Sequence, residues 1–263
     1  TNTLKTEPEQ EVAYLDERLF ATPSVAVAEC NKLSVEMANM ARESVEKALA
    51  NLNQYTEENE KSVVDLEEKT DIYEDRLGTY LVRLSGHSLG VDDNKSISRV
   101  LHTTDDFERI SDHALNLVNA GKELHDKQLH LSDKANEEMK VLQDAVSEVV
   151  KTAIESYENV DSALAEKVEP LEQVIDLLTE TIRLNHTERL KVGECTIERG
   201  SILIYILDNC ERISDHCSNI AVAVLTSKKN MYDPHKYLNK IKTMENPRFK
   251  KYFTSYQKKY RLP

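Results

Sequence analysis

Two copies of one charged motif carry the side chains of this sequence that could do chemistry. The hexapeptide Glu-Arg-Ile-Ser-Asp-His stands at residues 108–113 and again at 211–216, and an Asp precedes each copy by three residues. This spacing places three carboxylates on one side of a helix in each half of the chain. They are Asp105, Glu108 and Asp112 in the first copy and Asp208, Glu211 and Asp215 in the second.

A shorter acidic pair, Glu-x-x-x-Asp, recurs upstream of each copy. Glu67 and Asp71 in the first half align with Glu172 and Asp176 in the second. Like charges one helical turn apart repel by roughly a few tenths of a kcal/mol for each pair, and acids on an adjoining helix add to that repulsion. A hard divalent or trivalent cation would relieve it, and oxygen-rich sites suit magnesium, manganese, calcium or iron better than zinc. The sequence therefore predicts metal ions held by carboxylates from two helices of each half.

Other roles for these charged side chains stay open. Arg109 and Arg212 could compensate part of the repulsion, and the acids could form a solvated row without metal. His113 and His216 either support metal-bound carboxylates or are ordinary hydrogen-bonded side chains. A ferritin-like di-iron oxidase is the least consistent alternative, because that class needs Glu-x-x-His on two helices of one core. Each His here directly follows an Asp instead.

The elements that position these residues are expected to be long helices. Six Gly and six Pro in 263 residues, no Trp, and no Asn-Gly or Asp-Gly hairpin signal favour an all-α fold over sheets. The repeated motif indicates an internal duplication. Burial of the apolar stripes then predicts six long helices arranged as two tandem antiparallel three-helix bundles.

Local signals divide the chain into four expected segments. These are a lead-in at 1–22, a first repeat at 23–125, a second repeat at 126–226 and a basic tail at 227–263. Pro170 is expected to start or kink the fifth helix, which ends near 191, and Gly121 to stop the third. The other helices are expected at about 23–52, 57–85, 93–122, 133–157 and 195–226.

Charge separates an acidic body from the basic tail. Of the 34 Lys and Arg residues, eleven lie in 227–263 together with two of the 47 Asp and Glu, so the tail carries +9 and the remainder −22. The acidic body argues against nucleic-acid binding. Pro234 and Pro247 divide the tail into short pieces. Their Lys, Arg and Tyr side chains could contact anionic lipid, fold back on the acidic body or form a dimer contact.

The rest of the sequence excludes several protein classes. It has no nucleophile–base pair, phosphate-binding glycine loop or zinc-protease motif, so a non-enzyme is expected. The longest apolar run, at 202–207, has six residues, far fewer than the ~18 that a membrane-spanning helix needs. The chain opens at Thr1 without Met, which suggests a soluble piece excised from a longer protein. The cysteines form no C-x-x-C pair and are expected to be reduced: Cys30, Cys195, Cys210 and Cys217.

These motifs resemble the PhoU family. Residues 14–19 and 22–26 are similar to the segment that follows the last membrane helix of bacterial sodium/phosphate cotransporters. Four further stretches are similar to the cytoplasmic C-terminal PhoU-like domain of the same cotransporters: residues 170–172, 186–190, 193–195 and 211–221. The resemblance extends over about residues 14–225 and is most specific in the second half.

The resemblance implies a phosphate-signalling regulator that binds multinuclear metal clusters, often of iron or zinc, with manganese and magnesium also suited to its oxygen ligands. The implied ligands are Glu67, Asp71, Asp105, Glu108, Asp112, Glu172, Asp176, Asp208, Glu211 and Asp215. In the cotransporter branch the domain lies on the cytoplasmic side of the cell membrane, beside its own transporter domain, and modulates phosphate uptake. One alternative is a free-standing cytosolic regulator that contacts a separate transporter or a sensor kinase. A metal-free acidic helical scaffold is a further alternative.

Overall fold

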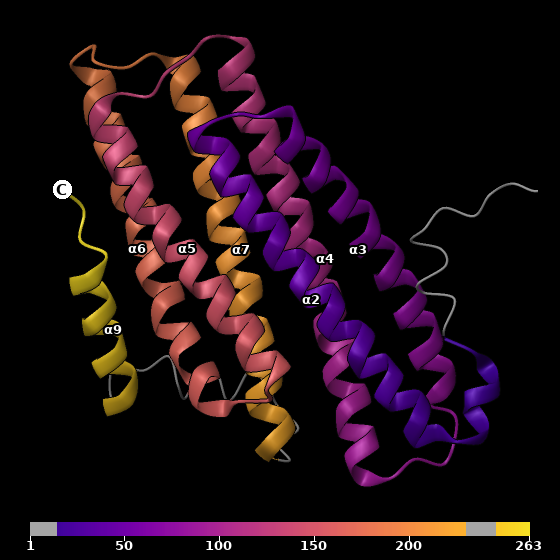
Figure 1. Cartoon of the computed structure of the whole chain (residues 1–263). Helices are drawn as coiled ribbons and strands as arrows, with labels where there is room; N and C mark the ends of the chain where they lie inside the picture. Colours follow the sequence, from indigo (N-terminus) through magenta and orange to yellow (C-terminus); the bar gives the residue numbers. More distant parts are fainter. Residues whose placement is uncertain (1–14, 230–245) are drawn as a thin grey trace, which may run out of the picture.

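The computed structural model describes residues 15–229 and 246–263, and every regular element in this part of the chain is helical (Figure 1). The expected all-α fold is therefore confirmed. The described residues contain seven α-helices rather than six, because a short helix lies in the segment expected to be a tail. In chain order the elements are the 3-10 helix η2 (Glu17–Ala21) and the α-helices α2 (Pro23–Asn53), α3 (Glu57–Leu84), α4 (Val91–Asp126), α5 (Asp133–Glu158), α6 (Ser162–Lys191), α7 (Ile197–Lys229) and α9 (Pro247–Lys259).

Side-chain caps set where two of the long helices begin. The Thr56 hydroxyl accepts a hydrogen bond from the backbone N–H of Asn59 at the start of α3. The Ser132 hydroxyl accepts one from the backbone N–H of Ala135 at the start of α5. Each bond satisfies one of the N–H groups that a helix leaves open in its first turn. Both starts are those expected from the sequence.

Neither Pro170 nor Gly121 marks a helix boundary. Pro170 is buried inside α6 rather than at its start, because the Asp161 side chain caps the helix well upstream. Gly121 lies inside α4 and does not stop it. A Cβ at Gly121 would come within 3.3 Å of the backbone oxygen of Asn51 on α2. Glycine at this position therefore allows two helices to approach closely.

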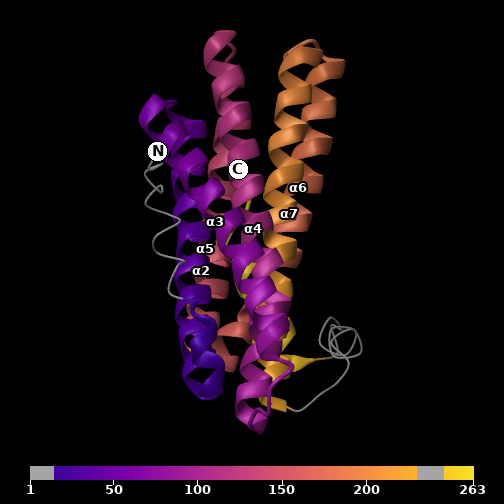
Figure 2. The same ribbon diagram turned by 90° about the vertical axis from the view of Figure 1, so that its right-hand side faces the viewer.

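Two three-helix bundles lie side by side in the described structure (Figures 1 and 2). Helices α2, α3 and α4 pack against one another, as do α5, α6 and α7. Contacts of α4 with α7 and of α2 with α5 join the bundles, and the apolar stripes merge into one core. Cys30, Cys210 and Cys217 are free thiols in this core, and burial raises the pKa of Cys30 to about 12. No helix in the described ranges combines the length and apolar content needed to cross a bilayer.

Helix α9 lies against α6 at the edge of the second bundle (Figure 1). Its buried side chains are Phe249, Phe253 and Tyr256, and Tyr260, which follows the helix, is buried too. Arg248 pairs with Glu166 at 3.1 Å, and Lys259 pairs with Glu148 at 2.5 Å. Of the three alternatives for the basic tail, contact with the acidic body is the one that α9 makes. The tail residues 230–245 lie outside the described part of the chain.

A close contact between α6 and α7 gives a first prediction. A Cβ on Gly200 would lie 2.3 Å from Nε2 of His186, which is buried. Gly200→Ala is therefore expected to destabilise the protein by about 1–3 kcal/mol, because the buried imidazole would have to shift within the packed core. Urea denaturation measures the change.

Gly78→Ala is the matched control for this substitution, since nothing lies within 4 Å of a Cβ at Gly78 in α3. Removing a glycine from a helix interior without a clash should stabilise the protein by about 0.5–1 kcal/mol. Effects of the same sign and size at the two glycines would contradict the close packing at Gly200.

Candidate metal centre

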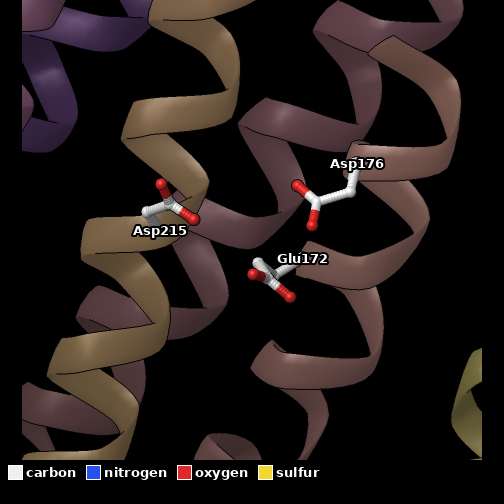
Figure 3. A group of neighbouring side chains, drawn as sticks. All are labelled: Glu172, Asp176 and Asp215. Atoms are coloured by element: carbon white, nitrogen blue, oxygen red, sulfur yellow. The ribbon is translucent and has the colours of Figure 1, made fainter. Parts of the chain in front are cut away.

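Three carboxylates of the second bundle converge between α6 and α7. Figure 3 shows Glu172 and Asp176 on α6 turned toward Asp215 on α7. One oxygen from each residue lies within 4.8 Å of an oxygen from the other two. Glu172 is only 4% exposed. The sequence therefore identified three side chains that come close enough to share a cation.

The other two expected ligands of this half, Asp208 and Glu211, are held by an arginine. Arg183 on α6 places one guanidinium nitrogen 2.6 Å from Asp208 and 3.0 Å from Glu211. The Thr179 hydroxyl lies 3.5 Å from Glu211 and can donate to it. Sequence analysis missed Arg183 and Thr179. In this conformation one guanidinium balances the charge of both acids.

Arg212, the arginine within the repeated motif, has a smaller part in the charge balance. It lies 3.5 Å from Asp215, its neighbour three residues along α7, and its side chain is 67% exposed. An exposed ion pair of this kind contributes little to stability. Arg183, from the neighbouring helix, is therefore the main cation beside Asp208 and Glu211.

In the first bundle the acids of α3 and α4 act on one another across the helix interface. Burial raises the pKa of Glu67, and the charges of Asp112 and Asp71 raise it further. Burial also raises the pKa of Glu108, where Arg109 opposes the shift and Asp112 adds to it. These mutual effects place the five expected ligands of the first half in one negatively charged region.

Glu74 is a member of this region that sequence analysis missed. Burial raises its pKa, and the charge of Asp105 on α4 is the next largest cause. The charge of Arg109 opposes this shift, and its Nε lies 3.5 Å from Glu108 and 3.8 Å from Asp105. Its side chain is 52% exposed, so water screens much of its charge.

The two bundles thus differ at matching positions of α3 and α6. The alignment that pairs Glu67 with Glu172 also pairs Glu74 with Thr179 and Gly78 with Arg183. The first half therefore has the carboxylate of Glu74 where the second half has the Thr179 hydroxyl. It has a glycine, Gly78, where the second half has the guanidinium of Arg183. At these two positions the first half is therefore the more negative.

The repeated histidines lie in the seam between the bundles. His113 Nδ1 donates to Asn209 Oδ1 at 2.9 Å, and His216 Nδ1 donates to Asp106 Oδ1 at 2.9 Å. The two imidazole rings stack with their centroids 5.6 Å apart. Burial lowers the pKa of His113. The hydrogen-bonded role that the sequence left open is the one that both histidines have here.

Asp106 was not among the expected site residues. It is 7% exposed and also accepts a hydrogen bond from Asn219 Nδ2 at 3.0 Å. Asn209 stands at the matching position of the second motif, so each bundle supplies one acceptor to the other bundle's histidine. This exchange across the seam explains why the motif keeps its His in both copies.

Comparison with known proteins identifies the family. The PhoU domain matches residues 35–120 and 139–224, which correspond to the two bundles. The "Phosphate-specific transport system accessory protein PhoU homolog 1" of Thermotoga maritima is 27% identical over 137 residues, 51% of this chain and 58% of that protein. The chain thus matches little more than half the length of this relative.

Two crystal structures share the fold. PhoU from Pseudomonas aeruginosa has a TM-score of 0.71 and 21% identity, over 78% of this chain and 97% of the other. The phosphate transport system regulatory protein PhoU from Streptococcus pneumoniae has a TM-score of 0.68 and 16% identity, over 80% and 99%. None of these three relatives is described as a cotransporter domain. Because the matched segments cover more than half of its length, the chain belongs to the PhoU family.

Proposed function

We propose that this protein is a PhoU-type regulator of phosphate transport whose two bundles bind metal ions. The relative from Thermotoga maritima is named an accessory protein of phosphate-specific transport, and the one from Streptococcus pneumoniae a regulatory protein of a phosphate transport system. These names support a separate regulator better than a domain of a sodium-coupled transporter. The convergence of Glu172, Asp176 and Asp215 is the observation that carries the metal-binding part of the proposal.

The donor atoms decide which metals fit. The three convergent side chains and the acids facing one another in the first bundle are all carboxylates. Such oxygen sets suit hard cations such as magnesium, manganese or iron, and several carboxylates can bridge more than one ion. A bound cation would neutralise the repulsion between them, so it would stabilise the contacts of α3 with α4 and of α6 with α7.

Metal binding is expected to raise the melting temperature. A metal present at about a hundred times its Kd stabilises the folded state by roughly 2.7 kcal/mol for each site. Differential scanning calorimetry of chelator-treated protein, with magnesium, manganese, iron or zinc added in turn, measures this effect. Elemental analysis of protein purified without chelator identifies the resident metal.

The variant Glu172→Gln/Asp215→Asn should lose the metal-dependent shift of the second bundle. Glu137→Gln is the control, because Glu137 is an exposed acid of α5 outside both acidic clusters. A melting temperature that does not respond to any of the four metals would favour the metal-free scaffold instead.

The acidic region of the first bundle also predicts a pH dependence. The folded-state pKa of Glu108 is raised, so its ionised form destabilises the folded protein above the ordinary glutamate pKa of 4.5. Without metal, Glu108→Gln is therefore expected to stabilise the protein at pH 7 by roughly 0.5 kcal/mol after solvent screening, and not below pH ~4, where Glu108 is protonated in both states. Urea denaturation at both pH values tests this, and a stabilisation that persists at the lower pH would argue against the charge mechanism.

Regulation of phosphate uptake is tested in cells that lack this protein. Uptake is expected to become insensitive to external phosphate, and the intact protein should restore the response. Covalent cross-linking in the same cells would separate a transporter subunit from a sensor kinase as the contact. Unchanged uptake control in the deletion strain would oppose the regulatory role while leaving metal binding unaffected.

A further inference from the structure

A hollow at the junction of the two bundles has an uncharged lining. It measures about 580 Å³ and lies where the end of α2, the end of α4 and the start of α5 meet. The α2–α3 turn and the α4–α5 connection lie at this end of the molecule (Figure 1). None of its 16 lining residues is Asp, Glu, Lys or Arg, although these types make up 31% of the chain. An ionic ligand would lose its hydration there without gaining a counter-charge, so the lining favours a neutral ligand.

Side-chain amides supply most of the polar groups. They belong to Asn51, Asn53, Gln54, Gln128, Asn136 and Gln143. Each amide offers both hydrogen-bond donors and an acceptor. Asn51 is 1% exposed, and its Oδ1 accepts a hydrogen bond from the backbone N–H of Thr56 at 2.7 Å. Its Nδ2 is buried and has no hydrogen-bond partner within the described chain.

A pair of aromatic rings forms one wall of the hollow. The rings of Tyr55 and His125 stack with centroids 4.6 Å apart and planes 26° from parallel. The Tyr55 hydroxyl donates to Glu60, which also binds Lys122 at 2.7 Å. The hydrogen bond to Glu60 therefore fixes the Tyr55 ring from outside the hollow. The charges of Glu60 and Lys122 balance each other. A flat aromatic wall of this kind favours a planar ring as its ligand.

We propose that this hollow binds an uncharged, planar nitrogen heterocycle of the size of a purine nucleoside. The ring would lie against Tyr55 and His125, and its edge atoms would bond to the exposed amides of the lining, such as those of Gln54 and Gln128. The volume lies within the range of about 300–1,000 Å³ that is usual for small-molecule pockets. Free phosphate does not fit, because Lys122 is paired with Glu60 and Lys127 with Glu123 and Glu198.

Titration of the isotope-labelled full chain with adenosine and with guanosine, followed by NMR, tests the proposal. At least one nucleoside should cause saturable shifts confined to residues 51–55 and 121–143, with nuclear Overhauser contacts from its ring protons to Tyr55 and His125. Inorganic phosphate should cause no such shifts. The absence of saturable shifts with both nucleosides into the millimolar range, or an equal response to phosphate, would overturn the proposal.

Two variants locate the ligand within the hollow. His125→Ala removes a ring of the wall, and Asn136→Asp puts a charge into the neutral lining; each should weaken nucleoside binding at least tenfold. Gln257→Ala, which removes an exposed amide on α9, is the control and should change the affinity less than twofold. His125 and Asn136 are exposed, so both variants are expected to fold, and circular dichroism checks this. Unchanged affinity in both hollow variants would contradict the site. Metal binding does not enter this test, so its result is independent of the proposed function.

Discussion

Replacing Arg189 with Met is expected to lower the free energy of unfolding by about 3–5 kcal/mol. Arg189 on α6 donates to both oxygens of Glu138 on α5, at 3.0 and 2.8 Å, and the side chains are only 7% and 8% exposed. Asn185 donates to the same carboxylate at 2.8 Å. Without the guanidinium, the buried carboxylate would keep its charge beside a single neutral donor, which is a costly arrangement.

Urea denaturation followed by circular dichroism measures this loss. Lys191→Met is the matched control, because Lys191 pairs with Glu188 at 2.7 Å near the same end of α6, with side chains 64% and 69% exposed. An exposed pair of this kind contributes about 0–1 kcal/mol. The double variant Glu138→Gln/Arg189→Met should recover a large part of the loss, since no charge then stays buried. Similar losses for R189M and K191M, or no recovery in the double variant, would contradict this account.

The helices that carry this ion pair could be predicted from the sequence, but the pair itself could not. Helix starts at Thr56 and Ser132 followed from local chemistry, because a capping hydroxyl acts on its own first turn. The contact between Glu138 and Arg189 depends on which turns of α5 and α6 face each other, and that register is set by packing of the whole core. Pro170 misled for the same reason, since burial in the core overrode its local preference.

Helix α9 was missed although its signal is present. The tail was expected to be broken into short pieces by Pro234 and Pro247. Its buried residues nevertheless follow at helical intervals: Phe249, Phe253 and Tyr256 are four and three residues apart, and the buried C-cap residue Tyr260 follows four residues later. Pro247 at the first helical position is a start signal rather than a break. The helical spacing of these apolar residues is the signal that could have predicted α9.

The candidate site could be predicted only in part. Repetition of the acidic motif identified the carboxylates that face each other, because helical spacing fixes which side they occupy. Extending the alignment of α3 with α6 beyond Asp71 and Asp176 would have paired Gly78 with Arg183. The ion pairs of Arg183 with Asp208 and Glu211 needed the structure, because a long flexible side chain can reach several partners.

If metal ions bind as proposed, the arginine at position 183 should account for part of the difference in metal affinity between the bundles. Moving it to position 78 is then expected to weaken metal binding by the first bundle and to strengthen it in the second. Gly78→Arg should place a guanidinium beside Asp105 and Glu108, as Arg183 lies beside Asp208 and Glu211. A Cβ at Gly78 would meet nothing within 4 Å, so the new side chain can leave the helix without a clash at its first atom. The added charge should weaken metal binding by the first bundle at least roughly tenfold, equivalent to about 1.4 kcal/mol.

The reverse change, Arg183→Gly, should strengthen binding by the second bundle or increase the number of ions bound there. Isothermal titration calorimetry with manganese gives affinity and stoichiometry for both variants. Gly78→Ala is the control, because it changes helix propensity at the same position without adding charge, so its manganese affinity should equal that of the parent. If Gly78→Arg and Gly78→Ala bind manganese equally, charge at this position does not distinguish the bundles. If the parent binds no manganese, magnesium, iron or zinc at all, metal binding itself is refuted, so the two failures can be told apart.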